Sequence, residues 1–187
     1  MEVKILKSQI EFFETEEEFV SSPNDEVVIA VLEQTEVIYN GNSECNLEYC
    51  NIHGIKAYEG KIDTIGTGVV TKGSIVLTVK KKMINGGEAL SDSFAKALSQ
   101  YLIKKGLPSV RQDNNDVLVA DGKVASGGEI IINGFNYMGF QISINQDVEA
   151  IENICYKHSV KKPKALSDFG VSTDEIVEFC KNYFIKI

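Results

Sequence analysis

The sequence predicts a single α+β domain over residues 1–187, with a mixed, mostly antiparallel sheet and helices packed against it. Apolar runs of strand length recur along the chain, and short turns such as Asn133-Gly134 join several of them into hairpins. Segments with helical periodicity separate the groups of strands, and no repeat, low-complexity segment or linker interrupts them. A chain of 187 residues can bury one well-packed core.

Strands are expected where apolar residues alternate or run on without a break. The run from Val27 to Leu32 is continuous and typical of a buried strand, whereas Val3–Ile10 is expected at an edge. A lysine-bearing hairpin is expected near residue 121. Further strands are expected over residues 36–39, 55–58, 74–80, 129–132 and 137–144, with a glycine-punctuated turn or strand edge over 66–70.

Helices are expected between these groups. The clearest is Ala89–Lys105, in which apolar residues recur at helical spacing until Gly106 and Pro108 end the segment. Ser43 is expected to cap a short helix over 44–53 that ends at Gly54. Other helices are expected within residues 11–26, over 148–158 and from 173 onward.

Charge and composition limit the partners and the location. The net charge of −8 and the single arginine, Arg111, argue against nucleic acid as the main partner. No apolar run approaches the ~20 residues that span a membrane, and no signal peptide opens the chain. Four cysteines without such a signal indicate reduced thiols, so a cytoplasmic protein with no membrane partner is expected. An exported protein that has lost its leader is the alternative left open.

Two lysine runs are expected to be solvated loops, or alternatively to dock an acidic carrier domain. They are Lys80-Lys81-Lys82 and Lys161-Lys162-Pro163-Lys164.

Cys45, Cys50 and His53 suggest a zinc site, because zinc ligands are cysteines and histidines at short spacing. Cys50 and His53 lie one helical turn apart, but on a continuous helix Cys45 would lie about 140° away from that face. No Cys-x-x-Cys pair supports a site. Core cysteines, a helix-end histidine and no metal are therefore expected.

The stretch from Asn115 to Gly128 is the most informative. Asp121-Gly122 between two apolar runs predicts a type I′ hairpin turn, from which Lys123 leaves on a strand. The glycines at 127 and 128 leave room for another backbone or a ligand. A lysine fixed beside such backbone can neutralise a phosphate or carboxylate, and a solvated lysine after a surface hairpin is the alternative.

Five strings between Glu26 and Asp174 carry a resemblance to a known family. They read NLEYCNIHGI (46–55), GTGVV (66–70), NDVLV (115–119), GKVAS (122–126) and GFQISIN (139–145). Their order and spacing resemble the lipoate/biotin protein ligase and octanoyltransferase superfamily, which attaches acyl groups to a lysine of a carrier domain. The resemblance implies the fold of the catalytic domain of these ligases.

The resemblance also implies roles for particular residues. Lys123 would contact the acyl carbonyl and the phosphate side of an activated acyl group, where one well-placed donor stabilises a developing oxyanion by roughly 3 kcal/mol. In the octanoyltransferase branch a cysteine nucleophile falls near Cys155, and a buried cysteine on a helix face is the alternative. Substrate-binding roles would fall on Gly66, Gly68, Asn115, Asp116, Gly127 and Gly139.

The chain departs from the ligase pattern around residues 62–72. The arginine pair before three glycines is absent, Thr67 replaces one glycine, and no histidine follows. Met138 stands where octanoyltransferases have a second histidine. The expected activity is transfer of a lipoyl or octanoyl group to a carrier-domain lysine, with a lipoyl or acyl carrier protein as partner. A transferase would need no cofactor and a ligase would need ATP and Mg.

Two other functions remain open. One is a catalytically degenerate protein that keeps the fold as a binding or assembly module. The other is a biotin-specific ligase, which the missing arginines disfavour.

Overall fold

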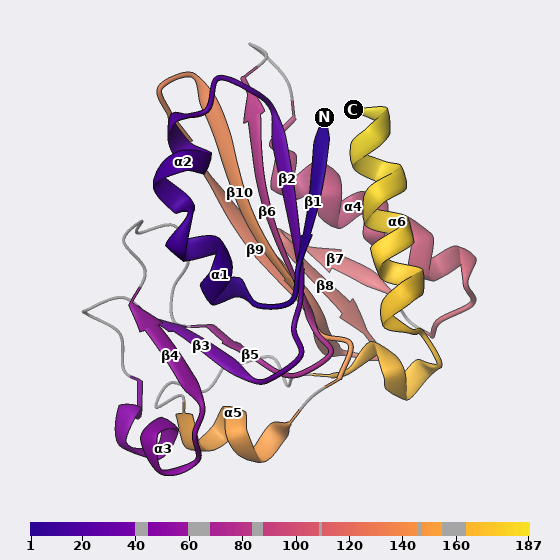
Figure 1. Ribbon diagram of the computed structural model, residues 1–187. Helices are drawn as coiled ribbons and strands as arrows, with labels where there is room; N and C mark the ends of the chain where they lie inside the picture. The colour runs from indigo at the N-terminus through magenta and orange to yellow at the C-terminus, as the bar shows by residue number, and fades with distance from the viewer. Residues whose placement is uncertain (40–44, 60–67, 84–87, 109, 146, 155–163) are drawn as a thin grey trace.

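Seven strands form the main sheet, in the order β1-β2-β6-β10-β9-β8-β7, and three form a smaller sheet, β4-β3-β5 (Figure 1). The computed structural model describes all residues except 40–44, 60–67, 84–87, 109, 146 and 155–163. In the main sheet only β1 and β2 pair in parallel, so the sheet is mixed and mostly antiparallel. The predicted fold class is confirmed. The strands are β1 (Glu2–Leu6), β2 (Glu26–Val31), β3 (Glu36–Tyr39), β4 (Lys56–Glu59), β5 (Gly68–Val70), β6 (Ile75–Lys82), β7 (Arg111–Asp113), β8 (Asp116–Val119), β9 (Gly122–Ile132) and β10 (Phe135–Ile142).

One face of the main sheet is covered by α4 (Leu90–Lys104) and α6 (Thr173–Lys186). Phe94 of α4 lies at the centre of this core, stacked on Phe184 of α6 at 5.4 Å and edge-on to Phe140 of β10 at 4.9 Å. Because side chains alternate along a strand, every second residue of each strand points to the face covered by α4 and α6, and the others point to the opposite face.

The opposite face is covered in part by α1 (Gln9–Glu14) and α2 (Glu16–Ser21), as Figure 1 shows. Three aromatic rings from these helices, Phe12, Phe13 and Phe19, pack on Val28 and Tyr137 of the sheet. The small sheet continues this layer, and α3 (Leu47–Ile52) and α5 (Val148–Ile154) lie at its far side.

Several expected boundaries are corrected. The first strand ends at Leu6, because the Ser8 hydroxyl caps α1 by accepting from the amides of Ile10 and Glu11. The acidic segment after it forms two short helices. In the α3 region the cap is Asn46, whose side chain accepts from the Tyr49 amide. The expected cap at position 43 and the end of the 148–158 helix lie outside the described residues.

Lys80 is the clearest error of the sequence reading. Instead of lying in a solvated loop, it is fully buried in β6, and its ammonium donates to the backbone carbonyls of Phe19 and Val20 at 2.8 and 3.1 Å and to that of Ser22. Burial lowers the pKa of Lys80. The lysine thus supplies donors to carbonyls at the end of α2, which a helix leaves unpaired. Within the described residues, no helix has the length and apolar character that crossing a membrane requires.

Candidate functional site

Lys123 is the second residue of β9 and follows a tight turn. The two residues of the turn with positive φ are Ala120 (45°) and Asp121 (62°), so the turn begins one residue earlier than the Asp-Gly pattern predicts. Gly122 opens β9 opposite Val119. The absence of a side chain at Gly122 makes room for Lys164, because a Cβ there would lie 2.3 Å from Cγ of Lys164.

An acidic side chain lies next to Lys123. The Nζ of Lys123 is 4.0 Å from Oδ1 of Asp116 at the start of β8, and both side chains are about three-quarters buried, with 28% and 23% exposed. Asn115 lies in the turn between β7 and β8, directly before Asp116. The structure therefore brings Lys123 and Asp116 together as an ion pair with partial access to solvent.

Arg111 shares a row with Lys123 across three strands. It pairs with Leu118 of β8, and Leu118 pairs with Lys123 of β9. With strands spaced about 4.8 Å apart, the Arg111 backbone lies two strand spacings, or roughly 10 Å, from that of Lys123. The only arginine of the chain thus occupies the row of the candidate catalytic lysine.

Small residues form a second row on the same face, the one opposite α4 and α6. Gly139 of β10 lies between Thr78 of β6 and Gly128 of β9. A Cβ at Gly128 would find no heavy atom of the described residues within 4 Å. Gly139 therefore lies on the same face of the sheet as Lys123, together with Gly128 and with Thr78, which the sequence did not suggest as a site residue.

Gly127 faces the other way. It pairs with Phe140, and a Cβ at this position would lie 2.2 Å from the Phe140 ring and 2.4 Å from the Gly139 carbonyl oxygen. The space beside Gly127 is filled by the protein's own core. The structure places Gly127 away from the site, because the strand alternates faces and Gly128 takes the position towards it.

The small sheet faces this row. Val70 of β5 packs in one apolar cluster with Val76 of β6, so Gly68, two residues earlier on β5, shares the face that points to the main sheet. The side-chain amide of Gln141 donates to the Val69 carbonyl at 3.0 Å and ties the two sheets together. Gly66 lies outside the described residues.

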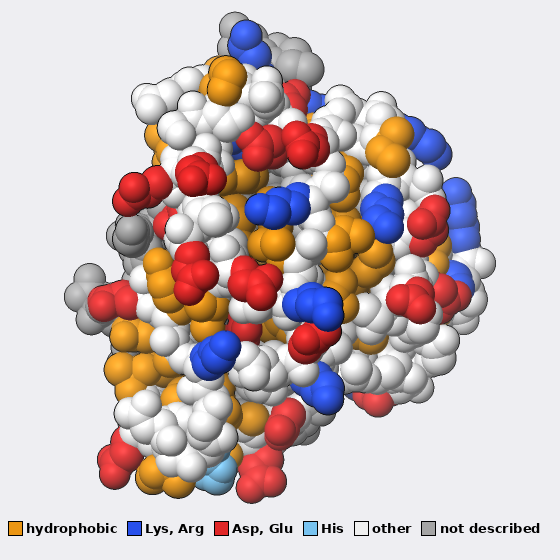
Figure 2. Space-filling view, in the orientation of Figure 1, with side chains coloured by type: hydrophobic (Ala, Val, Ile, Leu, Met, Phe, Trp, Pro, Cys, Tyr) orange, Lys and Arg blue, Asp and Glu red, His pale blue; other side chains and the backbone are white. Residues whose placement is uncertain are grey.

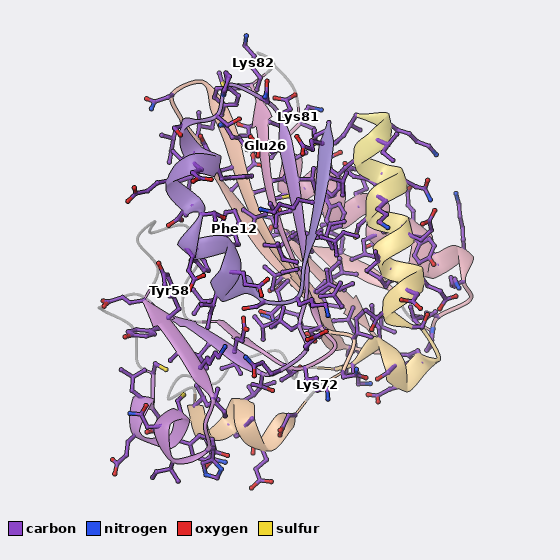
Figure 3. All side chains as sticks on the ribbon, viewed as in Figure 1. Phe12, Glu26, Tyr58, Lys72, Lys81 and Lys82 are labelled. Carbon is purple, nitrogen blue, oxygen red and sulfur yellow. The ribbon has the colours of Figure 1, made fainter. Side chains whose placement is uncertain are left out.

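Apolar and aromatic side chains lie next to the row of Thr78, Gly139 and Gly128, on the side towards α1 and α2. Tyr137 and Ile130 pair directly with one another, two residues along from Gly139 and Gly128, and join the cluster of α1 and α2. Tyr58 of β4 stacks on Phe13 of α1 at 5.0 Å, and Figure 3 shows that Tyr58 comes from the small sheet and Phe12 from α1. On the face of the molecule that Figure 2 shows, lysines and acidic side chains are interspersed, with apolar side chains visible between them.

The remaining candidates are not brought to this place. Cys155 lies outside the described residues, so its role stays a prediction. His53 stacks on Tyr49 at 4.1 Å, and among the described residues no group of three metal-ligating side chains is close enough to hold an ion.

The described geometry combines a lysine–aspartate pair, a glycine-lined strip of sheet and an aromatic border. No protein-family model matches the sequence, and no curated protein matches it. Solved structures do resemble the fold. LipL1 from P. falciparum, in complex with lipoate, superposes with a TM-score of 0.73 at 11% identity, covering 100% of this chain and 59% of that one.

Two further structures carry the same fold. Lipoate-protein ligase A bound with ATP gives a TM-score of 0.75 at 16% identity over 96% of this chain and 82% of that one. A bi-partite lipoate protein ligase studied with its E2 lipoyl domain, from Thermoplasma acidophilum, gives 0.70 at 16% identity over 100% and 83%. The chain has the fold of lipoate protein ligases and spans 59% of the length of LipL1. The expected resemblance is confirmed at the level of the fold.

Proposed function

We propose that this protein binds a lipoyl or octanoyl group and transfers it to a lysine of a carrier domain. The observation that carries the proposal is the position of the Lys123–Asp116 pair on the sheet face where Gly128 and Gly139 leave a strip without side chains. The fold supports it, because lipoate and ATP are bound by structures of the same fold.

The apolar part of the substrate is proposed to lie extended between β5 and the main sheet. Gly68 on one side and Gly128 and Gly139 on the other allow close approach to backbone, and Tyr137 and Ile130 supply apolar surface. The acyl carbonyl would then point to Lys123, whose ammonium stabilises negative charge that develops on the oxygen. Asp116, whose Oδ1 lies 4.0 Å from Nζ of Lys123, holds the lysine in position.

Two forms of this function differ in how the acyl group is activated. A transferase would receive an activated acyl group, with Cys155 as the proposed nucleophile, and would need no cofactor. A ligase would use ATP and Mg. In that route Lys123 is the cation that would hold the phosphates, because the arginine pair of the ligases is absent from residues 62–72. The proposed partner is a lipoyl carrier domain, as in the Thermoplasma system.

Lys123→Met tests the proposal. The protein is incubated with octanoyl-carrier protein, or with lipoate and Mg-ATP, and then with a lipoyl domain whose mass is measured. We expect acylation of the domain by the unmodified chain and at least a hundredfold slower reaction with Lys123→Met, since one lost oxyanion donor costs about that factor. Lys96→Met is the matched control, because Lys96 is exposed on α4 and its Nζ lies 3.8 Å from Glu88.

Gly128→Val provides a second test that does not touch the reacting atoms. The valine would fill the strip on the site face, so lipoate binding measured by calorimetry should weaken at least tenfold while thermal unfolding is unchanged. Normal acylation by both Lys123→Met and Gly128→Val would refute the proposal.

A non-catalytic module is the second candidate, favoured by the missing arginines at residues 62–72. It predicts binding of a carrier domain without acyl transfer in any of the mixtures above. The same lipoyl-domain experiment therefore distinguishes the two functions.

A further inference from the structure

Two cysteine side chains meet at the entrance to α3. Cys45 precedes the helix and is half-buried, whereas Cys50 lies within it with 1% of its surface exposed. The Cys45 side chain lies near enough to the Cys50 thiol to oppose part of the rise in pKa that burial gives Cys50. The helix starts at Leu47, so Cys45 is not part of it and the helical spacing that separated the two cysteines does not apply.

The backbone between the thiols is held in place by three hydrogen bonds. The Asn46 amide donates to the Ile154 carbonyl at 2.9 Å, the Asn46 side chain accepts from the Tyr49 amide at 3.0 Å, and the Cys50 amide donates to the Asn46 carbonyl at 3.2 Å. Both cysteines also belong to one apolar cluster with Val37 and Val69. The two sulfur atoms are therefore kept together by the fold.

We propose that Cys45 and Cys50 are a modification site that forms a reversible disulfide by exchange with a low-molecular-weight disulfide. The Cys45 thiolate attacks one sulfur of that disulfide, which releases one thiolate and leaves a mixed disulfide on Cys45. Cys50, after losing its proton to solvent, attacks the Cys45 sulfur and releases the second thiolate. The protein loses two protons and two electrons, and the small disulfide takes them up to become two thiols.

The difference in exposure sets the order of the two attacks. Cys45 is open to a small reagent and Cys50 is not. Burial raises the pKa of the Cys50 thiol, which keeps it protonated and unreactive toward reagents in solution. Cys50 therefore reacts only with the neighbouring Cys45 sulfur, once that sulfur carries the mixed disulfide.

The bond would lie behind the strand that faces the candidate site. Val69 of β5 packs in the cysteine cluster, and its carbonyl accepts the hydrogen bond from Gln141. A disulfide would tie the segment before α3 to the apolar side of this small sheet. The inference concerns the thiols alone and stands whether or not the proposed acyl transfer takes place.

The test uses the full chain, incubated with glutathione disulfide, alkylated under denaturing conditions and measured by mass spectrometry. We expect two alkyl groups fewer than on the untreated chain and, once the alkyl groups are subtracted, a mass lower by about 2 Da per chain. Residues 8–56 hold Cys45 and Cys50 without an intervening lysine or arginine, so trypsin leaves both in one peptide. Glu48 separates them, so a glutamate-specific protease should yield two peptides joined only by the disulfide.

Single variants identify the pair and the order of attack. Cys50→Ala should stop at the mixed disulfide and gain one glutathione, and Cys45→Ser should leave Cys50 reduced. Cys180→Ser and Cys155→Ser should both form the bond as the unmodified chain does. The inference is overturned if Cys45→Ser still loses 2 Da, if Cys155→Ser abolishes the loss, or if the unmodified chain stops at the mixed disulfide.

Discussion

The carboxylate of Glu36 accepts a hydrogen bond of 2.6 Å from the Ser8 hydroxyl, which joins the small sheet to the first helix. Glu36 has no exposed surface, and its second oxygen accepts from the backbone amides of Gln9 and Ile10 at 2.9 and 3.3 Å. These amides open α1, where a helix leaves its first donors unpaired. The buried acid therefore positions the layer that borders the candidate site.

Replacing Glu36 by leucine should destabilise the fold by about 3 kcal/mol, because it leaves the buried donors of Ser8 and Gln9 without their acceptor. Glu36→Gln should cost less, since the amide oxygen still accepts. Urea unfolding measures both. The control is Glu33→Gln, whose exposed side chain pairs with Lys7 at 2.8 Å and should change stability by under about 1 kcal/mol.

Lys80→Met should lower the free energy of unfolding by about 2 kcal/mol, because the carbonyls of Phe19 and Val20 lose their buried donor. The pH dependence has a definite sign. Between the lowered pKa of folded Lys80 and its ordinary value, the unfolded chain binds more protons, so this lysine makes stability rise with pH. The difference in unfolding free energy between the two proteins should therefore grow as the pH rises. Lys82→Met, at the exposed tip of β6 (Figure 3), should show neither effect.

Gly127→Ala and Gly128→Ala form a matched pair on adjacent positions. The first should destabilise by about 1–3 kcal/mol, since the methyl group would overlap the Phe140 ring and the Gly139 carbonyl. The second meets no heavy atom of the described residues and should leave the unfolding midpoint unchanged or higher. Equal stability of the two variants would contradict the assignment of the two faces.

Glu175 should make the fold sensitive to acid. The hydrogen bond from the Lys105 ammonium lowers the pKa of Glu175 to about 2, and the backbone amide of Ser172, which also donates to this carboxylate, adds to the effect. In the unfolded chain the carboxyl takes up a proton near pH 4.5, so the stabilisation is complete above that pH and is lost towards pH 2. Glu175→Gln should make the free energy of unfolding nearly independent of pH between pH 2 and 4.5, and Glu178→Gln should leave the pH dependence as it is. High salt should reduce the effect, because both partners are partly exposed.

Local patterns predicted the elements but not their contacts. The apolar spacing of α4 and the Asn133-Gly134 turn were read correctly, because each depends on its own residues. Lys80 was misread, since the carbonyls it serves lie some 60 residues earlier.

The site depended in the same way on contacts between distant strands. Which of Gly127 and Gly128 faces the site follows from the register of β9 against β10, and the row of Arg111 from its pairing with Leu118. A single sequence does not display such pairings.

The central place of β6 has a kinetic consequence. Ile75 pairs with Val31 on one side and with Ile142 on the other, whereas β7 to β10 pair only with strands next in sequence, apart from the contact of β10 with β6. The later hairpins close over short loops, but β6 must bridge two distant parts of the chain, which is slow because long loops cost entropy before any contact forms. The rate of folding should therefore be set by the arrival of this one strand, which also carries Thr78 and Lys80 into the layer beside the candidate site.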